Sequence, residues 1–295
     1  MTDYKKQHFV PQFYLRNFSD PIFCYDKLKD ESFRAPVSNI AYENYFYEVN
    51  GPQFGEIEKL LSDMEQEFSL AISEVFEKCN KERISPITFG FLCTCTVIQM
   101  LRTSDERIRL KEIHESMLDE LVRRKFGEEI LKEIKITPSE NTLKARHLEF
   151  LLSTYPKFVD ILFLKGHAYI PNLSGLPFWT SDNPVVLHND SGGDVGISEK
   201  NTEIHFPLKS DLTFVLFDPL HPVKIDENFA WYSNMLQVMN STRFIYSTVD
   251  DFEMAKEFLE KNPMYKDPKR KRMTILNQEN TIEVIHQSFG KLSYD

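Results

Sequence analysis

The chain has 295 residues, of which 41% are hydrophobic and 27% are charged, and its formal net charge is −10. That length and composition are typical of a globular protein that buries a sizeable core in one large domain or two smaller ones. The acidic balance argues against broad electrostatic binding to nucleic acid or another polyphosphate. No apolar run approaches the roughly 18 residues that a membrane-spanning helix needs, and the polar amino-terminus lacks the apolar segment of a signal peptide.

The cysteine spacing predicts neither a disulfide framework nor a zinc site. Four cysteines occur, at positions 24, 79, 93 and 95. Cys93 and Cys95 are two residues apart in an expected helix, so their side chains point in different directions and suit neither one metal ion nor one disulfide. We therefore expect a cytoplasmic protein, and the sequence indicates no residue as a metal ligand. The basic run Lys266–Arg272 is interpreted as a solvated loop before a strand.

The amino-terminal segment, residues 6–18, fits no regular helix or strand pattern. It sets His, Gln and Arg side chains among aromatic and aliphatic ones. Polar groups placed that densely among apolar ones must be hydrogen-bonded in the interior or must face a ligand. Residues 21–25 then indicate a short strand, and residues 35–49 a turn followed by a second short strand.

The middle of the chain, residues 56–165, is predicted to be helical. Residues 56–79 place apolar side chains at helical spacing, which is typical of one long amphipathic helix. Ser85 and Pro86 supply an N-cap and a first-turn proline for the next helix, over residues 87–103. Because that helix is apolar nearly all round, we expect it to be the central buried helix.

Two further helices are expected after it. A charged helix continues to a stop near Gly127. Residues 137–140 form a capping box that predicts the start of the next helix. The pair Tyr155-Pro156 is expected to break or kink that helix before residues 157–164, since the residue before a proline disfavours the helical conformation.

From His167 onward the hydrophobic pattern changes from helical to alternating spacing. Short strands joined by Pro, Gly, Asn and Asp turns are predicted, with helices over residues 228–240 and 250–262. A helical middle with β elements from both ends predicts an α+β fold, with a central helical bundle flanked by mixed or antiparallel strands from the N-terminal and C-terminal parts. The predicted strands cover residues 167–171, 178–180, 185–188, 203–208, 212–218, 244–247, 272–276 and 282–286.

Three polar residues of the amino-terminal segment recur at steps of four. His8, Gln12 and Arg16 would share one face if this segment were helical. Their chemistry suits a functional site, because His moves a proton near neutral pH, Gln orients water or substrate, and Arg binds an anion through paired hydrogen bonds. The alternative is structural, with Arg16 paired to a buried carboxylate and His8 capping a turn.

Gln99 and Arg102 lie three residues apart on the most apolar predicted helix. An arginine on a buried helix nearly always has a partner. Asp182, in the turn 181–184 between two predicted strands, is the partner that we predict. An Arg102–Asp182 pair of this kind either is purely structural or frames a pocket.

The pocket hypothesis joins the two halves of the chain. It expects the polar tips of His8, Arg16, Arg102 and Asp182 to converge on one site. The candidate catalytic residues are His8, Asp182 and Asn183, and the candidate ligand-binding residues are Gln12, Arg16, Gln99 and Arg102.

These segments resemble a known family. The chain is similar to the DUF4238 family in five blocks that follow the family order over nearly its whole length: Gln7–Phe18, Asn39–Ala41 with Tyr45–Tyr47, Gln99–Thr103, Thr180–Val185 and Phe206–Leu208. The resemblance implies that residues 1–295 form a single DUF4238-like domain. Since the family is poorly characterised, the resemblance implies no reaction.

Functions of two classes fit these residues. The first is a hydrolase or nuclease-like enzyme with a His/Arg/Asp site, acting on a small anionic, nucleotide or nucleic-acid substrate. Asp182 with the later Glu203-Ile204-His205 has the acids of a PD-(D/E)XK nuclease but a His where Lys belongs. The second is a non-enzymatic sensor or interaction protein that binds an anionic ligand through Arg16 and Arg102. A buried polar network that only fixes the fold is the third interpretation, and no cofactor is specified.

Overall fold

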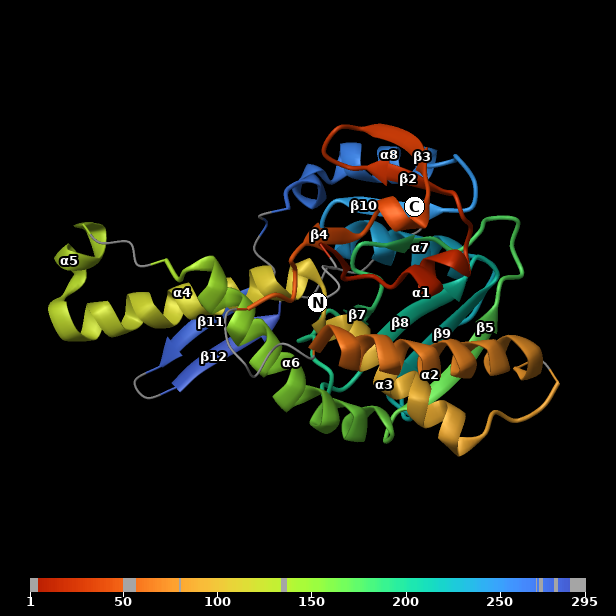
Figure 1. Ribbon diagram of the computed structural model, residues 1–295, viewed down its shortest axis with the longest axis horizontal. Coiled ribbons are helices and arrows are strands. Elements are labelled where there is room, and N and C mark those ends of the chain that lie inside the picture. Colours follow the sequence, from red (N-terminus) through yellow and green to blue (C-terminus); the bar gives the residue numbers. More distant parts are fainter. Residues whose placement is uncertain are drawn as a thin grey trace.

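The computed structural model describes residues 5–49, 57–79, 81–133, 137–268, 270, 273–278 and 281–286. The described elements form an α+β fold, which confirms the predicted fold class. Every strand pairing within them is antiparallel. Figure 1 shows a helical layer below two twisted sheets, with one long helix extending away from the rest of the molecule.

The middle of the chain folds into helices whose ends follow their sequence signals. Ser85 caps the second of them, because its hydroxyl accepts a hydrogen bond from the Thr88 N–H at 3.0 Å, and Pro86 occupies its first turn as predicted. Gly127 stops the charged helix at a φ of 90°, a value that favours glycine. The helices are α2 (Ile57–Lys78), α3 (Pro86–Leu101), α4 (Ser104–Phe126), α5 (Glu128–Glu133) and α6 (Glu140–Leu162).

Of the break or kink predicted at Tyr155-Pro156, the break is wrong, because α6 continues through Pro156 to Leu162. The buried residues Leu148, Leu151 and Leu162 lie on both sides of the proline, and α6 packs along α3. Burial of this common apolar face offsets the backbone hydrogen bond that a proline removes. The predicted capping box is also wrong, since Ser139 is the N-cap and accepts from the Thr142 N–H at 3.1 Å.

Two four-stranded sheets lie above the helices. The first has the order β5-β9-β8-β7 and packs one face on the helical layer and the other on α7. The second has the order β3-β2-β10-β6, so the first fifty residues pair with the carboxy-terminal part. The elements are β2 (Ile22–Asp26), β3 (Glu31–Ala35), β5 (Gly166–Pro171), β6 (Thr180–Ser181), β7 (Val186–Asn189), β8 (Thr202–Lys209), β9 (Leu212–Phe217), α7 (Phe229–Asn240), β10 (Phe244–Ser247) and α8 (Glu253–Lys261).

Shorter elements complete the described part of the chain. The amino-terminal strand β1 (Lys6–His8) pairs with β4 (Tyr42–Asn44), and the five-residue helix α1 (Gln12–Arg16) follows it. The hairpin of β11 (Met273–Gln278) and β12 (Thr281–His286) lies beside α4, on the arm that extends to the left in Figure 1.

The core forms where the sequence places it, with one exception. On the apolar faces of the two helices predicted over residues 56–79 and 87–103, Phe91 is half-buried, and the following residues are buried: Phe68, Ile72, Leu92, Val97, Ile98 and Leu101. Tyr14 of α1 joins distant segments of this core, because its hydroxyl donates to the Pro207 carbonyl at 2.6 Å and lies 2.7 Å from the Thr180 hydroxyl. The amino-terminal segment is therefore anchored to both the β6 region and β8.

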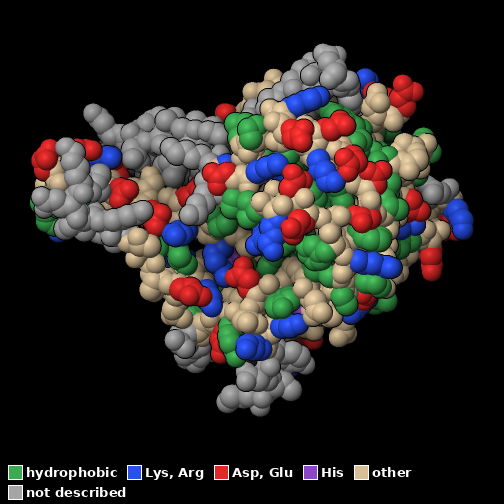
Figure 2. Space-filling model, turned by 90° about the horizontal axis from the view of Figure 1, so that it is seen from above, with side chains coloured by type: hydrophobic (Ala, Val, Ile, Leu, Met, Phe, Trp, Pro, Cys, Tyr) green, Lys and Arg blue, Asp and Glu red, His purple; other side chains and the backbone are tan. Residues whose placement is uncertain are grey.

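The surface carries both basic and acidic side chains. On the face shown in Figure 2, Lys and Arg side chains alternate with Asp and Glu side chains, and the described residues form no large region of one sign. None of the helices in the described ranges is both long and apolar enough to cross a lipid bilayer.

Two histidines are buried inside this fold in their neutral form. Burial lowers the pKa of His147 to about 3, and the ring contacts the Arg107 guanidinium and the Leu101 carbonyl. Burial and the neighbouring His205 lower the pKa of His188 to about 4.

These two histidines predict a loss of stability on acidification. The unfolded chain binds protons on both rings below about pH 6.5, whereas the folded protein does not, so stability falls as pH drops from about 7 to 5. We expect a loss of about 2 kcal/mol for each ring over that range. Urea unfolding of His188→Gln should show a shallower loss than the wild type by that amount. Equal losses in the two proteins would contradict the assignment.

Candidate functional site

The polar residues of the amino-terminal segment form a chain of contacts that ends at the surface. His8 is the last residue of β1, and Gln12 is the first residue of α1. Pro11, with an extended backbone, is the N-cap residue of this helix. The Gln12 amide nitrogen lies 3.4 Å from His8 Nδ1, and Arg16 Nη2 donates to Gln12 Oε1 at 2.7 Å. Arg16 is exposed and pairs with Asp20 at 3.4 Å. The three residues thus contact one another in series, but only Gln12 and Arg16 share a helix, and Arg16 faces solvent.

Arg102 is buried at the end of α3, and its predicted pairing with Asp182 is wrong. Its Nη1 donates to Glu65 of α2 at 2.7 Å, its Nε to the Tyr47 hydroxyl at 3.0 Å, and its Nη2 to the His8 carbonyl at 2.8 Å. The guanidinium therefore ties α2 and α3 to the amino-terminal segment. Glu65 is the carboxylate that compensates its charge.

The sequence of α2 contains a signal that Glu65 has a partner in the interior. The buried positions Ile57, Leu61, Phe68 and Ile72 form the apolar stripe of this helix, and position 65 falls within the stripe. A carboxylate within a buried stripe requires a cation or several donors on the facing element.

Asp182 does not pair with Arg102, and its carboxylate binds backbone N–H groups instead. It is buried, and its two carboxylate oxygens accept from the N–H groups of Thr242 and Arg243 at 2.8 Å and of Phe244 at 2.9 Å. Burial raises the pKa of Asp182, and these three donors oppose that rise. The carboxylate thus fixes the turn between α7 and β10.

Gln99 and Asn183 also join separate segments. The Gln99 amide donates to the Phe9 carbonyl at 3.1 Å and so attaches α3 to the amino-terminal segment. The Asn183 amide lies 3.4 Å from the Asn240 carbonyl at the end of α7.

Of the predicted site residues, His8, Gln12 and Arg102 meet at one cavity, which we call the amino-terminal cavity. Its volume is about 180 Å³, and its remaining lining residues are Lys6, Tyr47, Glu58, Leu61, Ser62 and Glu65. Burial and the Arg102 guanidinium lower the pKa of His8 to about 4, so its imidazole is neutral at pH 7. Arg16, Gln99, Asp182 and Asn183 do not line this cavity.

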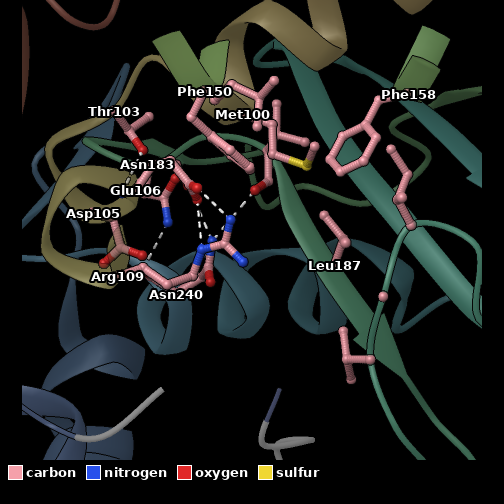
Figure 3. Close-up of a pocket in the computed structure, with 15 residues that line it drawn as sticks. Met100, Thr103, Asp105, Glu106, Arg109, Phe150, Phe158, Asn183, Leu187 and Asn240 are labelled. Carbon is pink, nitrogen blue, oxygen red and sulfur yellow. Dashed lines mark hydrogen bonds and ion pairs between the residues drawn. The ribbon is translucent and has the colours of Figure 1, made fainter. Parts of the chain in front are cut away.

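A second cavity, which we call the central cavity, lies on the other side of the α3–α4 junction. Its volume is about 200 Å³. Figure 3 shows Met100, Phe158 and Leu187 along one part of it and polar side chains gathered at the other end. The lining residues are Met100, Leu101, Thr103, Asp105, Glu106, Arg109, Phe150, Phe158, Asn183, Val185, Leu187, Val195, Gly196, Ile197 and Asn240.

The polar end of the central cavity is held by hydrogen bonds. Arg109 donates to both carboxylate oxygens of Glu106, with 2.7 Å between Nε and Oε2. Burial raises the pKa of Glu106, and the Arg109 guanidinium opposes that rise. The Thr103 hydroxyl caps α4 at the Glu106 N–H, at 3.3 Å, and Asp105 accepts from the Thr242 hydroxyl at 3.1 Å. These partners fix the directions of the charged groups.

Two of the sequence blocks singled out above meet at the central cavity. The block Gln99–Thr103 contributes Met100, Leu101 and Thr103, and the block Thr180–Val185 contributes Asn183 and Val185. Sequence reasoning missed the other polar lining residues, which are Asp105, Glu106, Arg109 and Asn240. Within the described residues, no three His, Cys, Asp or Glu side chains are grouped so that they could hold a metal ion.

Comparison with known proteins agrees with the block pattern. The family model described as "Protein of unknown function (DUF4238)" matches residues 6–251. No curated protein and no solved structure matches the chain. The family match includes both cavities, the α3–α4 junction and the turn held by Asp182. The chain therefore belongs to the DUF4238 family.

Proposed function

We propose that the protein is a binding or sensor protein that takes a small organic molecule into the central cavity. The observation that carries this proposal is the meeting of two blocks, Gln99–Thr103 and Thr180–Val185, at one cavity. The two blocks lie in opposite halves of the chain, and residues of both line this cavity. The cytoplasm is the compartment that we propose for it, from the composition of the chain.

The lining defines the kind of ligand. Small-molecule sites combine mostly apolar walls with a few fixed polar groups, and the apolar walls supply affinity while the polar groups set orientation. Phe150, Phe158 and Leu187 would contact the apolar body of the ligand, whereas the fixed Glu106–Arg109 pair would orient its polar group.

The geometry favours ligand binding over hydrolysis. A hydrolase of the predicted kind needs His8 and Asp182 on one substrate, but His8 lines the amino-terminal cavity and both carboxylate oxygens of Asp182 accept from backbone. An anion bound by two arginines is also disfavoured. Arg16 pairs with Asp20 and Arg102 pairs with Glu65, so neither guanidinium offers uncompensated charge.

A variant that fills the central cavity tests this proposal. Leu187→Trp places an indole in the cavity, and Leu173→Trp, at a position that is 89% exposed, is the matched control. Fluorine NMR of a library of fluorinated aromatic amides and amines reports binding by line broadening. We expect fragments that broaden with the wild type and the control but lose at least about tenfold in affinity with Leu187→Trp.

Two results of this experiment would contradict the proposal. Fragments that bind Leu187→Trp as tightly as the wild type, or a library without any binder, would contradict a ligand site in the central cavity. Thermal melts of both variants show that each is folded before the comparison is made.

A further inference from the structure

One face of α2 forms a wall of the amino-terminal cavity. Glu58, Leu61, Ser62 and Glu65 are spaced by three and four residues and line the cavity together. Glu58 accepts from the Gln7 amide at 2.7 Å through Oε2, and Glu65 accepts from Arg102 through Oε1. Within the described residues, the second oxygen of each carboxylate has no hydrogen bond, so both can accept one from a ligand.

The opposite wall carries a histidine. The His8 ring lies against the backbone of Ser38 and Val37, and its Nε2 is buried from solvent. Its ring is neutral, so this nitrogen donates or accepts according to the tautomer.

The two cations of the cavity are engaged in different ways. Lys6 is exposed, donates to Asn39 at 2.9 Å and lies over the Tyr42 ring. Neither contact is with Glu58 or Glu65. Arg102 uses three of its five N–H groups on protein acceptors, which leaves two donors.

The remaining charge is that of Glu58. Glu65 is compensated by Arg102, whereas Glu58 is bonded to a neutral amide and not to a cation of the described residues. Burial and the neighbouring Glu65 raise the pKa of Glu58. A cationic group placed between the two carboxylates would stabilise the ionised form and offset the cost of its burial.

We infer that the amino-terminal cavity is a second binding site, for a short primary amine that also carries a hydroxyl or carbonyl acceptor. The ammonium donates its three N–H groups to Glu58, Glu65 and the Ser62 hydroxyl. The acceptor group bonds to the remaining N–H groups of Arg102. The volume of about 180 Å³ corresponds to about six water molecules, which suits a molecule of a few heavy atoms. This ligand has the opposite charge to the anion that the sequence predicts.

Calorimetric titration of the full chain tests this site with ethanolamine as the probe. Glycolate and ethylene glycol are the anionic and neutral probes of similar size. Glu58→Gln removes the charge and keeps an acceptor for Gln7, and Glu67→Gln, at an exposed position of the same helix, is the matched control. Ser62→Lys, also at an exposed position, places a cation on the wall without disturbing the core.

We expect ethanolamine to bind more tightly than either comparison probe, with a loss of at least about tenfold in Glu58→Gln and Ser62→Lys and no change in Glu67→Gln. The inference is overturned if glycolate or ethylene glycol binds as tightly, if Glu67→Gln weakens binding as much as Glu58→Gln, or if the wild type gives no heat up to about 10 mM ethanolamine. The central cavity is untouched by these variants, so the two sites are tested separately.

Discussion

Arg102→Met is expected to lower the free energy of unfolding by about 3 to 5 kcal/mol. The substitution keeps the length of the side chain but removes the donors of three hydrogen bonds. The Glu65 carboxylate, the Tyr47 hydroxyl and the His8 carbonyl each lose a partner in the interior. Urea unfolding followed by circular dichroism measures the loss.

Double variants identify the partner of Arg102. Adding Glu65→Gln to Arg102→Met removes the stranded carboxylate and should recover part of the lost stability. Adding Asp182→Asn should not recover any, because Asp182 is bonded to a different segment, and the two losses should add. Recovery with Asp182→Asn and none with Glu65→Gln would contradict the pairing described here.

Asp182→Ala is expected to cost about 3 to 5 kcal/mol, because it strands three buried N–H groups at about 1 to 3 kcal/mol each, less what water recovers. The N–H groups belong to Thr242, Arg243 and Phe244. Asp182→Asn keeps one acceptor oxygen and should lose less. Hydrogen exchange should accelerate first at these three amides. A loss under about 1 kcal/mol for Asp182→Ala would mean that the turn is held by other contacts.

The elements of this fold follow from local signals in the sequence. The apolar stripe of α2, the Ser85-Pro86 start of α3 and the glycine stop of α4 are properties of short segments, and all three are confirmed. The expected break at Pro156 is wrong because packing on α3 outweighs the local preference of one residue.

The partners of the site residues could not be predicted in the same way. The charges of Arg102 and Asp182 both require partners in the interior, and the sequence alone suggests that each is the partner of the other. Their actual partners are a carboxylate 37 residues away and a backbone turn about 60 residues away. Backbone donors carry no sequence signal, so the role of Asp182 could not be predicted.

The polar end of the central cavity was missed for a related reason. Asp105, Glu106 and Arg109 begin a highly charged helix, and such residues are usually solvated. Here the first turn of α4 faces the end of α7, so the two carboxylates are buried, whereas the later turns extend to the surface. The position of α4 relative to the sheets decides which charges become part of a site.

Methyl NMR of methionine gives the most direct measurement of the central claim, that a small molecule occupies the central cavity. Met100 lines this cavity, whereas Met117 and Met264 are 44% and 64% exposed and lie outside its lining. With methyl-labelled methionine and Met100→Leu for assignment, a fragment that binds should shift the Met100 signal and leave those of Met117 and Met264 unchanged. An unshifted Met100 signal, with binding detected by another method, would contradict the account.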